Sequence, residues 1–191
     1  TEFRMDEALQ LTRRALFSAQ AVDAPESLYR WQWQLGRQLA ATGQLDQAIA
    51  SYRQAAVTLQ PIRVELAQAS SEGHAADQDT VKPLFFELAD LLLQRASLTE
   101  DATAAEGYLL SARDAIEAYK TAELRDYFKD DCVDAVRSRL TTFDRLSPDT
   151  AVIYPIMFSS RLELLMSLPS GLKRISVPVT AERLTQEIRE F

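Results

Sequence analysis

The sequence predicts a mainly α-helical protein: an array of about three antiparallel helix pairs, followed by a small addition rich in β-hairpins. Two observations support this prediction. Residues 29–62 place small and large apolar residues at the spacing of a two-helix repeat of about 34 residues. After Asp149 the apolar period changes from helical to extended. We therefore expect a helical array over residues 1–146 and a β-rich segment over residues 147–191.

The clearest repeat, residues 29–62, combines small residues that let two helices approach with larger residues that fill the seam. The small residues are Gly36, Ala48 and Ala55, and the larger ones are Leu35, Leu39, Leu45 and Tyr52. Gly43 is expected to make the turn, because glycine takes the left-handed conformation that ends a helix. The pattern is typical of the tetratricopeptide repeat (TPR). One such unit leaves its outer faces exposed, so neighbours are expected on both sides.

Neighbouring units follow from the same pattern. Residues 5–9 align with residues 45–49, which predicts that the first helix is the second helix of a preceding unit. That helix is expected to end near Pro25. A polar loop is predicted over residues 68–79, and a third unit begins at Lys82. Its second helix begins near Ala102, and separate helices follow over residues 122–132 and 133–140.

Strands are predicted over residues 151–158, 161–168 and 172–179, and a short helix over residues 182–191. Alternation of apolar residues predicts one apolar face, and such a face needs a cover. We expect it to pack on the last helices, near Val133, Val136 and Leu140, or to form a homodimer through an open edge. The residues of this predicted face are Tyr154, Ile156, Phe158, Leu162, Leu164 and Met166.

Composition narrows the function classes. The net charge of −7 and the lack of a basic patch argue against nucleic-acid binding. No apolar run approaches the roughly 20 residues that span a bilayer, so we expect no membrane partner. A lone Cys132 excludes an internal disulfide framework and a cysteine zinc site. A cytoplasmic protein without a cofactor is the expectation.

Two candidate sites have simpler structural interpretations. Cys132 and His74 are the only cysteine and histidine, but His74 lies in the predicted polar loop, where nothing holds it as a base. We interpret Cys132 as a packing residue and predict no catalytic residue. The carboxylates Glu123, Asp126 and Asp130 share a helix face, yet basic residues alternate with them. A salt-bridged face is therefore expected rather than a metal site.

The strongest functional signal is a groove lined by the first helix of each unit. A peptide or protein ligand is expected to bind six residues there: Arg30, Trp33, Arg37, Phe86, Asp90 and Gln94. The two arginines on either side of Trp33 would clamp an extended acidic or C-terminal peptide. The alternative is that Trp31 and Trp33 pack in the core while the arginines only solvate the face.

The order of the segments resembles bacterial proteins that carry TPR repeats before a CHAT domain. The segments that carry this resemblance are residues 83–93, 112–117, 122–132, 151–155, 161–165 and 177–180. CHAT domains are similar to caspases and separase, which implies a cysteine peptidase that uses a His and Cys pair. The family places that pair well after the opening strands, beyond Phe191. The resemblance thus implies that this segment is not itself an enzyme and that its own downstream protease domain is a partner.

These expectations lead to one functional hypothesis and one alternative. The hypothesis is a protein-interaction module that scaffolds or regulates a caspase-like cysteine peptidase. The alternative is a freestanding adaptor that binds an acidic or C-terminal peptide and uses its β-rich end for strand addition or dimerisation.

Overall fold

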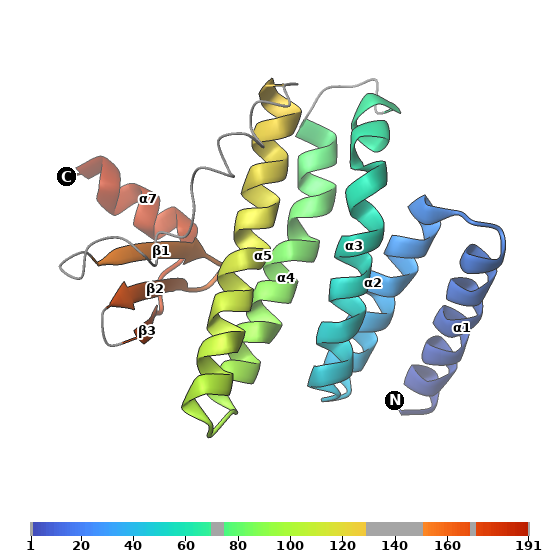
Figure 1. Ribbon diagram of the computed structural model, residues 1–191, viewed down its shortest axis with the longest axis horizontal. Coiled ribbons are helices and arrows are strands. Elements are labelled where there is room, and N and C mark those ends of the chain that lie inside the picture. Colours follow the sequence, from blue (N-terminus) through green and yellow to red (C-terminus); the bar gives the residue numbers. More distant parts are fainter. Residues whose placement is uncertain (1, 70–74, 129–150, 169–170, 191) are drawn as a thin grey trace. The chain divides into compact units, whose positions relative to one another are not determined.

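The computed structural model describes residues 2–69, 75–128, 151–168 and 171–190 (Figure 1). These parts are mainly helical, with a three-stranded antiparallel sheet near the C-terminus, so the predicted fold class is confirmed. The chain divides into two compact units, residues 1–95 and 96–191. The predicted boundary after residue 146 lies outside the described residues and stays a prediction.

The N-terminal unit consists of helices α1 (Glu2–Ala21), α2 (Pro25–Ala41), α3 (Leu45–Ala69) and α4 (Ala75–Ser97), the last of which ends just past the division. They run up and down side by side in Figure 1. Helix α2 begins at a proline, whose fixed φ suits the first helical position, where its missing N–H costs no hydrogen bond. The predicted break before α2 is confirmed.

Helices α2 and α3 form the helix pair that the repeat spacing predicts. Gly36 packs so closely that an added Cβ would lie 2.5 Å from a ring carbon of Tyr52. Gly43 has a φ of 76° in the turn between the helices, and its N–H donates to the carbonyl of Ala40 at 3.0 Å. Ala48 and Tyr52 are buried in the seam. The small residues therefore let α2 and α3 approach closely, as the spacing predicts.

Three helices run further than the sequence suggested. The structure extends α3 through Pro61, and α4 begins at Ala75 and passes through Pro83, so most of the predicted polar loop is helical. A proline removes one helical hydrogen bond, but buried neighbours such as Leu59 and Leu84 anchor both helices beside it. Helix α5 (Ala102–Phe128) is continuous across the predicted break near residue 121, where no glycine or proline interrupts it. The helix predicted over residues 133–140 lies outside the described residues.

The C-terminal unit combines α5 with strands β1 (Val152–Met157), β2 (Leu162–Leu168) and β3 (Gly171–Val177), then α7 (Ala181–Glu190). The strands pair antiparallel in the order β1-β2-β3. The predicted strands and final helix are confirmed to within two residues at each end.

Helix α5 holds the sheet at the start of β3. The Glu106 carboxylate accepts the backbone N–H of Leu172 at 2.9 Å. The Arg113 guanidinium lies 5.6 Å from the centre of the Tyr154 ring, so a second strand contacts the same helix. One face of the sheet is thereby turned towards α5.

The predicted single apolar face is wrong, because the strand register divides its residues between the two faces. Met157 pairs with Leu162, so even-numbered residues of β1 lie opposite odd-numbered residues of β2. Directly opposite residues share a face. Tyr154 and Ile156 therefore share a face with Leu165, which is fully buried. The other face, here called the open sheet face, consists of Ile153, Pro155, Met157, Leu162, Leu164, Met166, Lys173, Ile175 and Val177.

The open sheet face is largely apolar and partly exposed. Ile153 is 56% exposed, Ile175 is 45% exposed and Val177 is 37% exposed. Helix α7 buries none of its residues, and Ile188 is 67% exposed. The predicted cover from Val133, Val136 and Leu140 lies outside the described residues.

Candidate functional site

Two predicted groove residues meet on the carboxylate of Glu87, in a group here called the Glu87 cluster: Trp33, Arg37, Tyr52 and Glu87. The Arg37 guanidinium grips both carboxylate oxygens, from Nε at 2.9 Å and from Nη2 at 2.7 Å. The Trp33 indole and the Tyr52 hydroxyl each donate to Oε2 at 2.7 Å. Arg37 also lies 4.1 Å from the centre of the Trp33 ring. Three helices, α2, α3 and α4, are thus tied through one side chain.

The electrostatics of the Glu87 cluster favour its ionised form. Burial alone would raise the pKa of Glu87, but hydrogen bonds from Arg37, Tyr52 and Trp33 outweigh burial and hold that pKa below its ordinary value. Burial, followed by the bond to the carboxylate, raises the pKa of Tyr52. Arg37 therefore already binds a carboxylate within the chain, the chemistry predicted for a peptide ligand.

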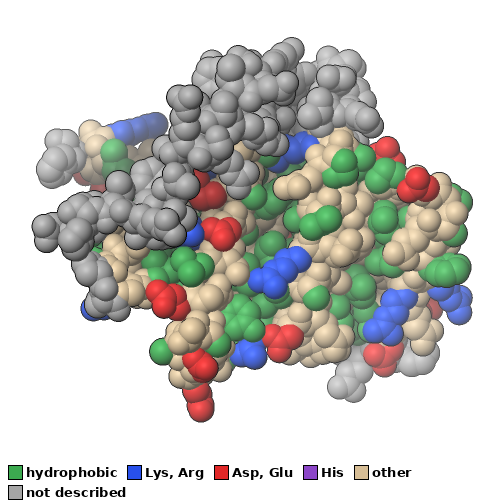
Figure 2. Space-filling model, viewed as in Figure 1, with side chains coloured by type: hydrophobic (Ala, Val, Ile, Leu, Met, Phe, Trp, Pro, Cys, Tyr) green, Lys and Arg blue, Asp and Glu red, His purple; other side chains and the backbone are tan. Residues whose placement is uncertain are grey.

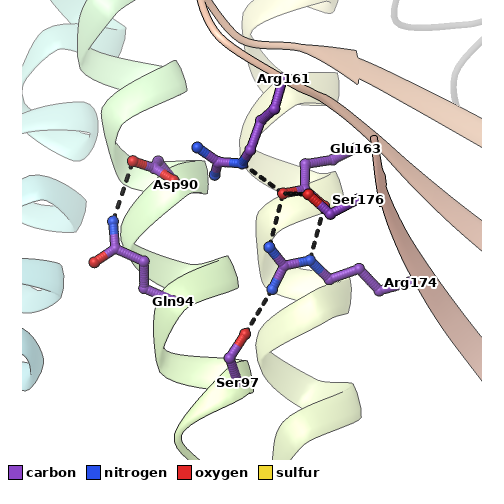
Figure 3. Close-up of polar contacts among 7 residues, drawn as sticks. All are labelled: Asp90, Gln94, Ser97, Arg161, Glu163, Arg174 and Ser176. Carbon is purple, nitrogen blue, oxygen red and sulfur yellow. Dashed lines mark hydrogen bonds and ion pairs between the residues drawn. The ribbon is translucent and has the colours of Figure 1, made fainter. Parts of the chain in front are cut away.

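The predicted groove residues on α4 have contacts of their own. Lys82 lies 5.3 Å from the centre of the Phe86 ring. The Gln94 amide donates to Asp90 at 3.1 Å, one helical turn away (Figure 3). Phe86 precedes Glu87 in α4 and lies about 100° from it around the helix axis, so the contacts of Glu87 do not by themselves place Phe86 beside Trp33 and Arg37. Binding of a partner there stays a prediction.

Arg30 lies elsewhere, at a hollow between α1 and α2 of about 550 Å³. The residues that line this α1–α2 hollow are Ala8, Leu11, Thr12, Ser27, Arg30, Trp31, Gln34 and Gln38. Figure 2 shows basic and hydrophobic side chains exposed next to one another over the N-terminal helices. The predicted clamp is therefore divided: Arg30 at this hollow, and Trp33 with Arg37 at Glu87.

The C-terminal unit contains a second carboxylate gripped by arginines. Glu163 is fully buried, and Arg161 donates to it from Nε at 2.6 Å. Arg174 donates from Nε at 2.8 Å and from Nη2 at 2.7 Å, and the Ser176 hydroxyl adds a bond at 3.1 Å (Figure 3). Arg174 also donates to Ser97 at 2.7 Å. Burial would raise the pKa of Glu163, but these bonds outweigh it and lower the pKa.

Sequence reasoning missed Glu87, Glu163 and the lining of the α1–α2 hollow. Glu87 had a usable signal, because it follows Phe86 on the helix that was expected to face Arg37. Glu163 had no such signal, since a carboxylate that alternates with apolar residues in a strand is expected to face solvent. Gln38 had no signal either, since glutamine is mostly exposed in proteins, yet here it is only 8% exposed.

The remaining candidate residues from the sequence include Cys132, His74, Asp130 and Glu123. Cys132, His74 and Asp130 lie outside the described residues. Glu123 accepts a hydrogen bond from Tyr119. Within the described ranges, no group of three or more potential metal-binding side chains comes together. Among these same residues, no helix is both long enough and apolar enough to cross a membrane.

Comparisons with protein-family models, with curated proteins and with solved structures found no match. A function for this chain therefore has to be inferred from its side chains and their contacts.

Replacing Arg37 with Ala is expected to lower the free energy of unfolding of the N-terminal unit by about 1 kcal/mol at neutral pH, the sum of a partly exposed ion pair and its ring contact. The pKa of Glu87 is depressed, so the contribution is present above the ordinary value of 4.5 and is lost as the pH falls through the folded pKa. Urea unfolding of wild type and variant, followed by tryptophan fluorescence at pH 7 and at acidic pH, measures this.

The matched control is Arg13→Ala, which removes an exposed arginine of α1. Equal unfolding free energies for wild type and Arg37→Ala at neutral pH would show that the Arg37–Glu87 ion pair adds nothing to stability.

Proposed function

We propose that this chain is a protein-interaction module that scaffolds or regulates a caspase-like cysteine peptidase of the CHAT type. Three facts support the proposal. Helices α2 and α3 pack as a pair, the arrangement by which helical repeats present surfaces to partners. The strands follow the helices in the order that the resemblance implies. The sheet leaves one largely apolar face partly exposed.

The open sheet face is the observation that carries the proposal. Three strands and one short helix bury little apolar surface by themselves. Here α5 covers one face of the sheet, while Ile153 and Ile175 on the other face stay about half exposed. Helix α7 has an apolar stripe that is also exposed. Both surfaces are what the opening strands of a larger α/β domain would offer to the rest of that domain.

The reading frame beyond Phe191 tests this proposal. We expect it to encode further strands and a His and Cys pair, and the longer protein should react with a thiol-directed peptidase probe. The present chain should not label selectively at Cys132, because its lone His74 is not expected to activate it. A frame that ends at Phe191, or one without such a pair, would remove the peptidase from the proposal.

A freestanding adaptor is the second candidate, and the strand edges favour it. Pro155 lies in β1, where a proline has no N–H to offer to an added strand. β3 has no proline within its length, so its outer edge is the better template for strand addition. A frame that ends at Phe191 would support this candidate, with β3 as the site of addition.

A further inference from the structure

The α1–α2 hollow has the size of a ligand site. Its volume of about 550 Å³ falls in the range of roughly 300–1,000 Å³ that is usual for binding pockets. It is open to solvent, and its lining mixes hydroxyl, amide and guanidinium groups with a few apolar side chains. Such a mixture suits a ligand that brings both polar and apolar groups.

The bottom of the hollow contains an unused hydrogen-bond acceptor. Thr12 is 4% exposed and Gln38 is 8% exposed. The Gln38 amide nitrogen donates to the Thr12 hydroxyl at 3.0 Å. The amide oxygen of Gln38 is buried and has no hydrogen-bond partner in the part of the chain that the structure describes. Because buried polar atoms are normally paired, a small rotation of this side chain would let the oxygen accept a bond from an N–H group of an occupant.

The rim of the hollow holds Arg30, which has no carboxylate partner among the described residues. Arg30 donates from Nε to the hydroxyl of Tyr29 at 3.1 Å, a bond that raises the pKa of Arg30 and fixes the direction of the guanidinium. Its two terminal nitrogens have no hydrogen bond or ion pair with the described residues. A planar guanidinium presents paired donors that match a carboxylate.

Apolar contacts complete the rim. Trp31 is 39% exposed and Leu11 is 57% exposed, and both line the hollow. An indole ring with one face in solvent is a common anchor for a partner's side chain. The hollow therefore offers three kinds of contact: an acceptor at the bottom, a cation at the rim and an apolar wall.

We propose that the α1–α2 hollow binds an extended acidic peptide segment. The carboxylate of that segment pairs with Arg30, an apolar side chain packs on Trp31 and Leu11, and a main-chain N–H reaches Gln38. A helical segment fits less well, because its main-chain N–H groups are already used within the helix. The inference depends on the proposed interaction function but not on the identity of the downstream domain.

Fluorescence anisotropy with labelled short peptides tests the proposal on the whole chain. The probes carry a Leu or Phe beside Asp or Glu residues, and their controls carry Asn or Gln in place of the acids. Acidic probes are expected to bind, and Arg30→Gln should weaken that binding by about ten-fold or more, the usual size of a charged hydrogen-bond pair. Gln38→Leu should weaken it as well.

Arg13→Gln is the matched control, because it removes the same charge from α1 at a residue that does not line the hollow. It should leave the affinity within about two-fold, since exposed charges outside a site contribute little. Three outcomes would overturn the inference: equal binding of acidic and amide probes, equal losses in Arg30→Gln and Arg13→Gln, or tighter binding of an amphipathic helical peptide. None of them bears on the reading-frame test, so the two proposals fail separately.

Discussion

Replacing Glu163 with Ala is expected to destabilise the C-terminal unit by about 3 kcal/mol, the lower end of the cost of breaking a buried ion pair, because the side chains of Arg161 and Arg174 are 27% and 22% exposed. Glu163 is fully buried, and its two oxygens accept bonds from two arginines and a serine. The variant would keep Arg161 and Arg174 on the covered face of the sheet with no carboxylate between them. A loss of this size is a large fraction of the roughly 5–15 kcal/mol by which a typical domain is stable.

Hydrogen exchange of the strands β1, β2 and β3 measures the effect directly, because it reports opening of the sheet apart from the helical array. Glu163→Gln should fall between wild type and Glu163→Ala, since the amide retains one acceptor but no charge. Glu187→Ala is the control. Its partner Arg183 is 75% exposed, so the loss should be negligible. Similar strand protection in Glu163→Ala and Glu187→Ala would contradict the expectation.

Acidic pH should cause part of the same loss of stability in the C-terminal unit. The folded pKa of Glu163 lies below its ordinary value of 4.5, so the stabilisation is complete above that value. It is lost as the pH falls through the folded pKa, where the carboxyl group takes up a proton. The difference in strand protection between wild type and Glu163→Gln should therefore shrink in acid.

Replacing Gly36 with Ala should destabilise the N-terminal unit, because overpacking a filled core usually costs about 1–3 kcal/mol. The added Cβ would lie 2.5 Å from one carbon of the Tyr52 ring and 2.7 Å from another. The ring has little freedom to move away, because Tyr52 is 3% exposed and its hydroxyl is bound to Glu87. The gain in helix propensity from alanine, about 1 kcal/mol, offsets only part of this cost.

Gly107→Ala makes the comparison a matched one. Gly107 lies inside α5, and apart from the adjacent helix backbone no atom of the described residues lies within 4 Å of the position that its Cβ would take. The same exchange should stabilise the chain there by up to about 1 kcal/mol. Thermal and urea unfolding followed by circular dichroism compares the two variants. If Gly36→Ala were as stable as Gly107→Ala, the close approach of α2 and α3 would have no energetic weight.

The sequence and the structure agree where spacing along the chain is sufficient. Gly36, Ala48 and Tyr52 follow the period of a two-helix repeat, so the α2–α3 pair could be predicted without any distant contact. The strands could also be predicted from local sequence, because apolar residues alternate in them and a turn near Gly171 separates the last two.

Contacts between segments that are far apart in the sequence could not be predicted from local spacing. Sequence spacing indicates that Arg37 faces a neighbouring helix, but it does not show that Glu87 fills the guanidinium fork from 50 residues away. The sheet faces depended on the residue opposite Met157, and a shift of one residue reverses every side chain of a strand. Arg30 and Arg37 looked equivalent for the same reason, although one meets Glu87 and the other lies at the α1–α2 hollow.

The grip of α5 on the sheet has a mechanical consequence. Glu106 and Arg113 hold the sheet near the N-terminal end of this helix, while the helix continues to Phe128. At 1.5 Å per residue, the part beyond Arg113 is a rod of about 22 Å. The grip itself spans about 10 Å of the axis. A sideways displacement of the far end of α5 therefore acts on the strands as a lever does. The part of the helix beyond Arg113 is roughly twice as long as the part that holds the sheet.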